Sequence, residues 1–197
     1  MEPTHLLSEY SVRPQDNSRV IAALAAAVPN ENTLGLFRTE LGRLNRITWL
    51  RSLRQEVQSK IDDLPGIPVE LSGSVFHATT TRLTLGLGPN FPEGRNVYEL
   101  RRYRAAPGDA ATFLDRYREI ASLRDTFSLC SGFWIAQSPG FDELIHLWPY
   151  RDLEERRKSR EAAGANPVMG KYALSAVTLL TEQNAEILVP VGMQKFR

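Results

Sequence analysis

The pattern of hydrophobic and polar positions occurs twice along the chain. Residues 7–14 (LSEYSVRP) align without a gap on residues 100–107 (LRRYRAAP), and residues 35–37 (GLF) align on residues 132–134 (GFW). A repeated unit of about half the chain indicates two copies of one fold. Charged and aromatic strand positions are kept mainly in the second copy, so we expect any chemistry to belong to that copy.

The strands of the second copy follow from short alternating segments. Residues 97–104 alternate with a period of two and end before Pro107-Gly108, which predicts a strand. Residues 132–137 and 143–148 flank a short turn and predict a hairpin. Residues 186–189 precede Pro190 and predict the last strand.

The helices of the second copy follow from a longer period. Apolar residues between 113 and 121 recur at helical spacing, and Asp109 is the predicted cap of that helix. Asp152 stands three residues before Glu155 and predicts a second helix, which extends to about residue 163. Asn166 and the proline after it predict a further short helix.

The first copy repeats this plan more loosely. Its predicted strands are residues 6–12, 34–39, 46–50 and 81–87, and its predicted helices are residues 18–28 and 53–61. Residues 62–80 receive no assignment. The residues between Gly86 and Gly94 include two prolines and predict a linker.

The element order predicts the fold class. Strand, helix, strand, strand, helix, strand is the ferredoxin-like order, an antiparallel sheet with helices on one face. We therefore expect an α+β protein in which two such repeats pack sheet to sheet as a pseudo-dimeric α+β barrel with a central cavity. The predicted domains are residues 1–88, a degenerate repeat, and residues 96–197, joined by a linker at 89–95.

Several motifs of the second copy resemble the NIPSNAP family. They are residues 97–103 (VYELRRY), 132–134 (GFW), 146–150 (HLWPY), 153–156 (LEER) and 186–190 (EILVP). The resemblance implies a dimeric α+β barrel fold. It implies no agreed reaction, because the family is known mostly for binding, mitochondrial signalling and vesicle-related roles. The wider barrel group, which includes cofactor-free monooxygenases, haem-handling enzymes, cyclases and isomerases, offers an analogy at the level of the fold.

Strand alternation separates two sets of side chains in the second copy. We expect the helix-covered face of the sheet to take aliphatic residues, namely Leu100, Ile145 and Leu147. The charged and aromatic set would then point into the central cavity: Glu99, Arg101, Tyr103, His146 and Trp148. Charged groups beside aromatic rings in an enclosed space are typical of small-molecule sites.

The predicted catalytic residues are His146, Glu99 and Arg101. His146 would act as general acid or base, Glu99 would orient its imidazole, and Arg101 would stabilise an enolate or carboxylate. A structural interpretation stays open for each, because Glu99 and Arg101 could form a buried ion pair and a strand histidine often serves packing.

The predicted substrate-binding residues are Tyr103, Trp134, Trp148, Tyr10 and Thr48. The first copy is expected to place Leu6, Ser8, Thr48 and Leu50 where the second has Glu99, Arg101, His146 and Trp148. An apolar wall would then face a polar one, which suits a largely apolar organic substrate.

Composition narrows the remaining function classes. The 24 basic and 23 acidic residues leave a net charge of +1, which argues against nucleic-acid binding. Cys130 is the single cysteine, and the three histidines are far apart in sequence, so we expect neither a disulfide nor a metal site. We expect no membrane span and no cofactor, since nothing in the sequence requires haem, and we expect a cytoplasmic protein that can form a homo-oligomer.

The sequence thus predicts a small-molecule-binding protein. The first hypothesis is a cofactor-independent enzyme of cyclase, isomerase or monooxygenase type, in a biosynthetic pathway. The alternative is a non-enzymatic binding or scaffold protein of NIPSNAP type, in which the charged helix around residues 154–161 presents a surface to a partner.

Overall fold

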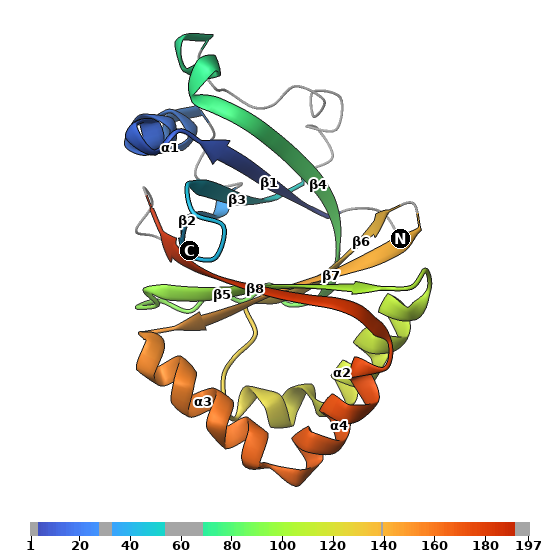
Figure 1. The fold of residues 1–197 in the computed structure, drawn as a ribbon. Coiled ribbons are helices and arrows are strands. Elements are labelled where there is room, and N and C mark those ends of the chain that lie inside the picture. The colour runs from blue at the N-terminus through green and yellow to red at the C-terminus, as the bar shows by residue number, and fades with distance from the viewer. Residues whose placement is uncertain (1–3, 28–32, 54–68, 139, 192–197) are drawn as a thin grey trace. The chain divides into compact units, whose positions relative to one another are not determined.

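The chain forms two compact units, each built on an antiparallel sheet with helices (Figure 1). This computed structural model describes residues 4–27, 33–53, 69–138 and 140–191. The first unit comprises residues 1–84 and 186–197, and the second comprises residues 85–185. The α+β class predicted from the element order is confirmed.

The first unit has the ferredoxin-like strand order β4-β1-β3-β2. Its strands are β1 (His5–Val12), β2 (Thr33–Leu41), β3 (Arg46–Ser52) and β4 (Val75–Leu87). Two short 3-10 turns, Pro14–Asp16 and Val69–Ser74, precede helix α1 (Asn17–Ala27) and strand β4, respectively. The end of strand β8 (Leu180–Pro190) belongs to this unit as well, where Leu188 pairs with Thr39 of β2.

The second unit repeats the order as β8-β5-β7-β6. It contains β5 (Val97–Ala105), β6 (Gly132–Ser138), β7 (Phe141–Tyr150) and the first half of β8. Its helices are α2 (Asp109–Asp125), α3 (Leu153–Ala165) and α4 (Pro167–Val177). Helix α4 contacts both α2 and α3, so three helices cover one face of this sheet where the ferredoxin-like order requires two (Figure 1).

Two of the three predicted helix caps are present. The Asp152 carboxylate accepts a hydrogen bond from the Glu155 backbone N–H at 2.7 Å, and the Asn166 side chain accepts from the first turn of α4. The prediction for Asp109 was wrong, because Asp109 is the first helical residue and Gly108, at φ +92°, precedes it. The Gly108 N–H is bound instead by the Asp142 carboxylate.

Parts of the first copy extend beyond what the sequence predicted. Strand β4 begins at Val75, within the stretch that received no assignment, and pairs with β1 between Val75 and Leu83. The helix predicted at residues 53–61 lies almost wholly outside the described residues. None of the helices in the described ranges combines the length and apolar character that a membrane crossing requires.

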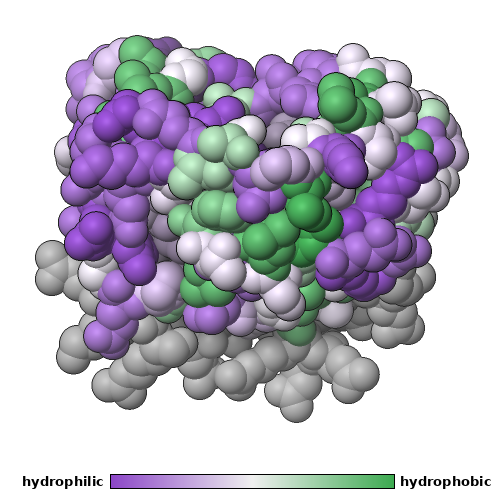
Figure 2. Space-filling view, turned by 90° about the horizontal axis from the view of Figure 1, so that it is seen from below, coloured by the Kyte–Doolittle hydropathy of each residue, from purple (hydrophilic) through white to green (hydrophobic). Residues whose placement is uncertain are grey.

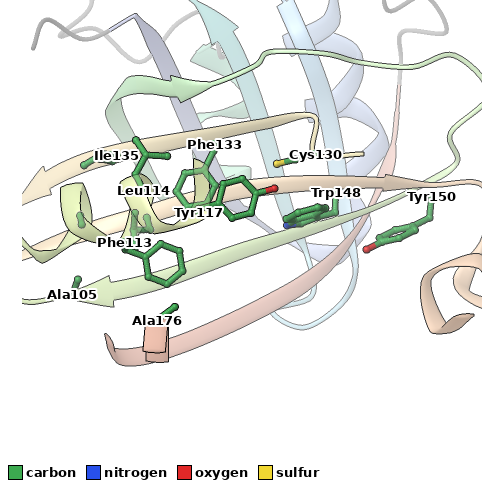
Figure 3. Packing of buried hydrophobic residues seen from close by; sticks show 12 residues of the cluster. Ala105, Phe113, Leu114, Tyr117, Cys130, Phe133, Ile135, Trp148, Tyr150 and Ala176 are labelled. Atoms are coloured by element: carbon green, nitrogen blue, oxygen red, sulfur yellow. The ribbon is translucent and has the colours of Figure 1, made fainter. Parts of the chain in front are cut away.

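Each unit has its own hydrophobic core, which lies beneath α1 in the first unit and beneath its three helices in the second. In the first unit, Tyr10 and Trp49 pack with Val20 and Leu24 of α1. In the second, aromatic side chains of α2 meet those of the strands, and Figure 3 shows Tyr117 lying against Phe133 and near Trp148. The second core is therefore rich in aromatic rings, and it borders the candidate site.

Candidate functional site

A cavity of about 440 Å³ lies within the second unit, between the sheet and the three helices. Strands β5, β6, β7 and β8 supply one wall, and α2, α3 and α4 supply the others. Arg101, Tyr103, His146 and Trp148, four of the five residues assigned to a cavity by sequence, line it together. Its size falls in the range of small-molecule pockets, about 300–1,000 Å³.

The predicted orientation of these residues was wrong. The alternation along β5 and β7 is as expected, but Arg101 and His146 face the helices. Leu100, Ile145 and Leu147 are buried on the opposite face of the sheet. The reason is that the helices contribute aromatic and arginine side chains to the cavity and not a continuous aliphatic surface. The helix-covered face of the sheet can therefore carry polar residues.

His146 is held by a hydrogen bond from Trp148. The indole Nε1–H donates to the imidazole Nδ1 at 2.8 Å, and both groups are buried. An indole nitrogen can only donate, so Nδ1 must be the unprotonated acceptor and the neutral ring carries its proton on Nε2. The Nε2 atom has no hydrogen-bond partner in the described part of the chain. The imidazole therefore has an unpartnered N–H donor at Nε2, and neither of its nitrogens is available to act as a base.

The surroundings of His146 keep it neutral. Its ring stacks on Phe133 at a centroid distance of 4.8 Å and meets the edge of Tyr103 at 4.6 Å, and the residue is 3% exposed. Burial lowers the pKa of His146 well below its ordinary value, and the positive charges of Arg101 and Arg124 lower it further. At neutral pH the imidazole is thus an uncharged donor. In this tautomer Nε2 has no lone pair to give to a haem iron, so the site does not fit haem ligation through His146.

Glu99 binds arginines and not the imidazole, which corrects its predicted role. Its carboxylate is fully buried and accepts hydrogen bonds from Arg101 at 2.9 Å, from Arg156 at 2.7 Å and from Arg160 at 3.0 Å. Burial alone would raise the pKa of Glu99, but Arg101 and Arg156 outweigh it and lower the pKa to about 2. The ion pair that the sequence left open is therefore present, and it fixes the guanidinium of Arg101 at the cavity wall.

The cavity wall is cationic. Arg101, Arg124 and Arg160 line it, and the described lining residues include no aspartate or glutamate. The guanidinium groups of Arg101 and Arg124 lie 5.4 and 4.1 Å from the centre of the Trp148 ring. The hydroxyls of Tyr117 and Tyr172 are buried without a partner in the described ranges, and burial raises the pKa of each above its ordinary value. Arginines and residues with unpartnered buried donors therefore line one space.

Three predicted binding residues lie elsewhere. Trp134 points to the other face of β6 from Phe133, where its ring covers Gly132. Tyr10 lies in the core of the first unit against α1. Thr48 is buried on β3 of that unit, between Ile47 and Trp49, which point to the α1 side. None of these three lines the cavity of the second unit.

Sequence reasoning missed the contribution of helix α2. Phe113 and Tyr117 line the cavity, whereas their spacing in the sequence predicts only an amphipathic helix. Arg124 follows Tyr117 by seven residues, which places it on the same helix face. A charged residue on an otherwise apolar face was the feature that could have revealed the site. Among the described residues, no group of three or more histidine, cysteine, aspartate or glutamate side chains is placed to hold a metal ion.

Comparisons with known proteins agree with this fold. The family model named NIPSNAP matches residues 98–195. The NipSnap protein of Drosophila melanogaster is 27% identical over 97 residues, which is 49% of this chain and 36% of that protein. The matched segment thus spans about a third of the length of such curated relatives.

Solved structures are similar over nearly the whole chain. A protein of Lactobacillus acidophilus NCFM, provisionally described as a monooxygenase, has a TM-score of 0.67 at 11% identity, covering 96% of this chain and 94% of its own. An anthrone oxidase-like protein has a TM-score of 0.61 at 10% identity, covering 99% of this chain and 96% of its own. At such identities the likeness concerns the fold alone. Through residues 98–195, the chain belongs to the NIPSNAP family.

Proposed function

We propose that the cavity of the second unit is an enzyme site that binds a small organic molecule and stabilises it as an oxyanion, such as an enolate or a phenolate. The observation that carries the proposal is the buried, unpartnered Nε2 of His146, a residue that lines the cavity together with arginines and, among the described residues, with no carboxylate. Buried donors without partners are costly unless something binds them. An anionic oxygen is the ligand that would satisfy this donor.

The residues would act by electrostatic stabilisation. The Nε2–H of His146 would donate to the substrate oxygen, and Arg101, fixed by Glu99, would supply positive charge beside it. The low polarity of the aromatic surroundings strengthens both interactions. A bound ketone or phenol would lose its proton more readily than in water, because its anion is favoured.

This mechanism differs from the one predicted by sequence. His146 already carries a proton on Nε2 and its other nitrogen is bound by Trp148, so it serves as a donor and not as a general base. The proton that the substrate loses would pass to water. Isomerisation, cyclisation and oxygenation of activated ketones and phenols all proceed through such anions. The descriptions of the two similar solved structures are compatible with this reaction class.

Binding of the anion can be tested with 4-nitrophenol, whose ionised form absorbs visible light. We expect the protein to shift the ionisation of the bound dye to lower pH. Arg101→Met should weaken binding by about 10- to 100-fold, since hydrogen bonds to charged groups contribute about 1.5–3 kcal/mol. Arg102→Met is the matched control, because Arg102 follows on the same strand and pairs with Glu143. Equal binding of neutral and ionised dye would contradict the proposal.

Catalysis can be tested separately by hydrogen exchange. A ketone such as 2-tetralone exchanges its α-hydrogen for deuterium in heavy water through its enolate, and NMR follows the loss of the proton signal. We expect the protein to accelerate this exchange and both Arg101→Met and His146→Phe to slow it. If the dye binds as its anion while no ketone tested exchanges faster, the non-enzymatic binding protein is the better description.

A further inference from the structure

We propose that the ligand of this cavity is an amphipathic acid, with its anionic oxygen at Arg101 and His146 and an apolar body that leaves between α3 and α4. The proposal deepens the proposed function and rests on it. It concerns which molecules the oxyanion site accepts and by which route they enter.

The cavity changes in character from the sheet to the helices. At the sheet, the lining is cationic and aromatic, as at Arg101 and Trp148. Toward α3 and α4, the lining is mostly small and aliphatic, although these helices also contribute Arg160 and Tyr172. The small and aliphatic residues are Ala163, Gly164, Met169, Gly170, Ala173, Ala176 and Val177. A ligand that fills both regions must itself be charged at one end and apolar at the other.

The apolar end of the cavity is open to solvent. His146 at the sheet is 3% exposed, whereas Val177 is 48% exposed and Gly164 and Ala173 are exposed. The opening is therefore bounded by α3 on one side and α4 on the other. A ligand longer than the cavity would extend through this opening without displacing the sheet.

Two helical glycines at this end are not explained by the protein alone. Gly164 of α3 and Gly170 of α4 have no positive φ, and a Cβ atom added at either would meet no atom within 4 Å. Glycine within a helix is less favourable than alanine, so neither helix geometry nor internal packing accounts for these residues. A ligand that passes close to the two helix backbones would account for both.

Apolar side chains continue outside the opening on helix α4. Leu174, one helical turn before Val177, is 75% exposed, and Val168 at the start of the same helix is 51% exposed. Figure 2, seen from the side on which α2, α3 and α4 lie in Figure 1, shows hydrophobic residues gathered at the centre of the face with hydrophilic residues around them. The apolar part of a long ligand would find contacts there.

A series of 4-alkylbenzoates, from benzoate to 4-hexylbenzoate, tests this inference by calorimetry. Each added methylene should strengthen binding by about fourfold while it is buried, from the usual free energy per buried methylene. We expect the gain to continue through several carbons and to level off at the opening. Affinity that is independent of chain length, or that falls from the first carbon onward, would overturn the inference.

A pair of variants places the apolar body in the opening. Ala173→Leu adds bulk to α4 at the cavity lining and should abolish the gain for long chains while reducing the affinity for benzoate much less. Ala162→Leu adds the same bulk to an exposed position of α3 outside the lining and should change neither. Equal loss of the gain in both variants, or in neither, would contradict the assignment.

The two proposals fail in different ways. If benzoate does not bind the unmodified protein, or binds equally to Arg101→Met, the oxyanion site itself is wrong. If benzoate binds through Arg101 but the alkyl chain adds nothing, the oxyanion site stands and the route between α3 and α4 is wrong.

Discussion

The helix-covered faces of the two units use similar positions for different purposes. Tyr10 pairs with Ile47 in the first unit, and Tyr103 pairs with Leu144 in the second. Counting from these pairs, Ser8 and Trp49 occupy the places of Arg101 and His146, and Leu6 and Arg51 occupy those of Glu99 and Trp148. The sequence prediction of Thr48 and Leu50 at the last two places was wrong by one residue on β3.

This register changes the contrast between the units. The first unit is not simply an apolar version of the second, because Arg51 is buried there, donates to Ser8 Oγ at 2.8 Å and lies over the Trp49 ring at 4.4 Å. What it lacks is the imidazole and a carboxylate at the place of Glu99. The comparison shows that a buried arginine over an indole is common to both units, whereas the unpartnered imidazole of His146 belongs to the second.

Glu99→Gln should have the largest effect. The carboxylate is fully buried and shared by three arginines, and removal of one partner from a buried ion pair costs about 3–5 kcal/mol. Because Arg156 and Arg160 are partly exposed, we expect the lower end, about 3 kcal/mol, in the free energy of unfolding measured with urea. Glu161→Gln on the exposed face of α3 is the control and should cost less than about 1 kcal/mol. A similar loss of stability in the two variants would contradict the role of Glu99 as the shared partner of the three arginines.

Trp148→Phe and Trp49→Phe compare the two indoles directly. Trp148 donates to buried His146, so its loss leaves a buried acceptor unpaired and should cost about 2–3 kcal/mol, together with altered ligand binding. Trp49 donates to the half-buried Thr33 hydroxyl at 3.2 Å, and its replacement should cost about 1 kcal/mol and leave binding intact. Nitrogen-15 NMR of the His146 ring would report its tautomer. An unchanged tautomer in Trp148→Phe would contradict the proposal that Trp148 fixes it.

The pH dependence of stability should reflect the neutral state of His146. Its pKa in the folded protein is lowered, by burial first and then by Arg101 and Arg124, so below about pH 6.5 the unfolded chain binds a proton that the folded protein does not. Stability is therefore lost as pH falls from 6.5 toward the lowered pKa, by up to about 1.4 kcal/mol per pH unit. His146→Gln should flatten the profile between pH 7 and 5.

His5 of the first unit offers the parallel case. Burial lowers the pKa of His5 to about 4, so His5→Gln should also reduce the loss of stability between pH 6.5 and 4. Ligand binding should distinguish the two variants, since only His146→Gln is expected to weaken binding of 4-nitrophenolate. A weakened ligand affinity in His5→Gln would argue against confinement of the site to the second unit.

Arg51→Met should have the smallest effect. Methionine keeps much of the contact with Trp49 and removes a buried charge, so the free energy of unfolding should change by less than about 1 kcal/mol. Ligand binding should not change, in contrast to Arg101→Met. If Arg51→Met weakened binding as much as Arg101→Met does, the two units would not differ in the way described.

The sequence predicted the order of elements because their periodicity and caps are local properties. The hairpin of β6 and β7 and the caps at Asp152 and Asn166 depend on neighbouring residues and appear as expected. The face occupied by Arg101 and His146 depends on which side chains α2, α3 and α4 bring to the sheet. That is a long-range property, and the rule that helices cover aliphatic residues fails where a cavity separates the two layers.

The roles within the site were partly predictable. Membership of Arg101, Tyr103, His146 and Trp148 in one cavity followed from alternation and chemistry. The hydrogen bond by which Trp148 orients His146 could not be predicted. A spacing of two residues on a strand indicates that both side chains lie on one face, but it does not indicate the rotamers that bring the two rings together. The spacing of Arg124 from Tyr117 indicates the face of α2 on which it lies, but its place at the cavity also depends on how α2 lies over the sheet.

The hydrogen bond from the Trp148 indole to the His146 imidazole also fixes the direction in which hydrogen bonds are donated through the pair. Trp148 can only give a hydrogen bond, and His146 is thereby left able only to give one in turn. A pair ordered in this way cannot hand a proton back and forth as a relay would. If a hydrogen-bond acceptor replaced the indole, the proton of the His146 ring would move to Nδ1 and Nε2 would become a base. A single substitution would then convert a site that binds negative charge into one that removes protons.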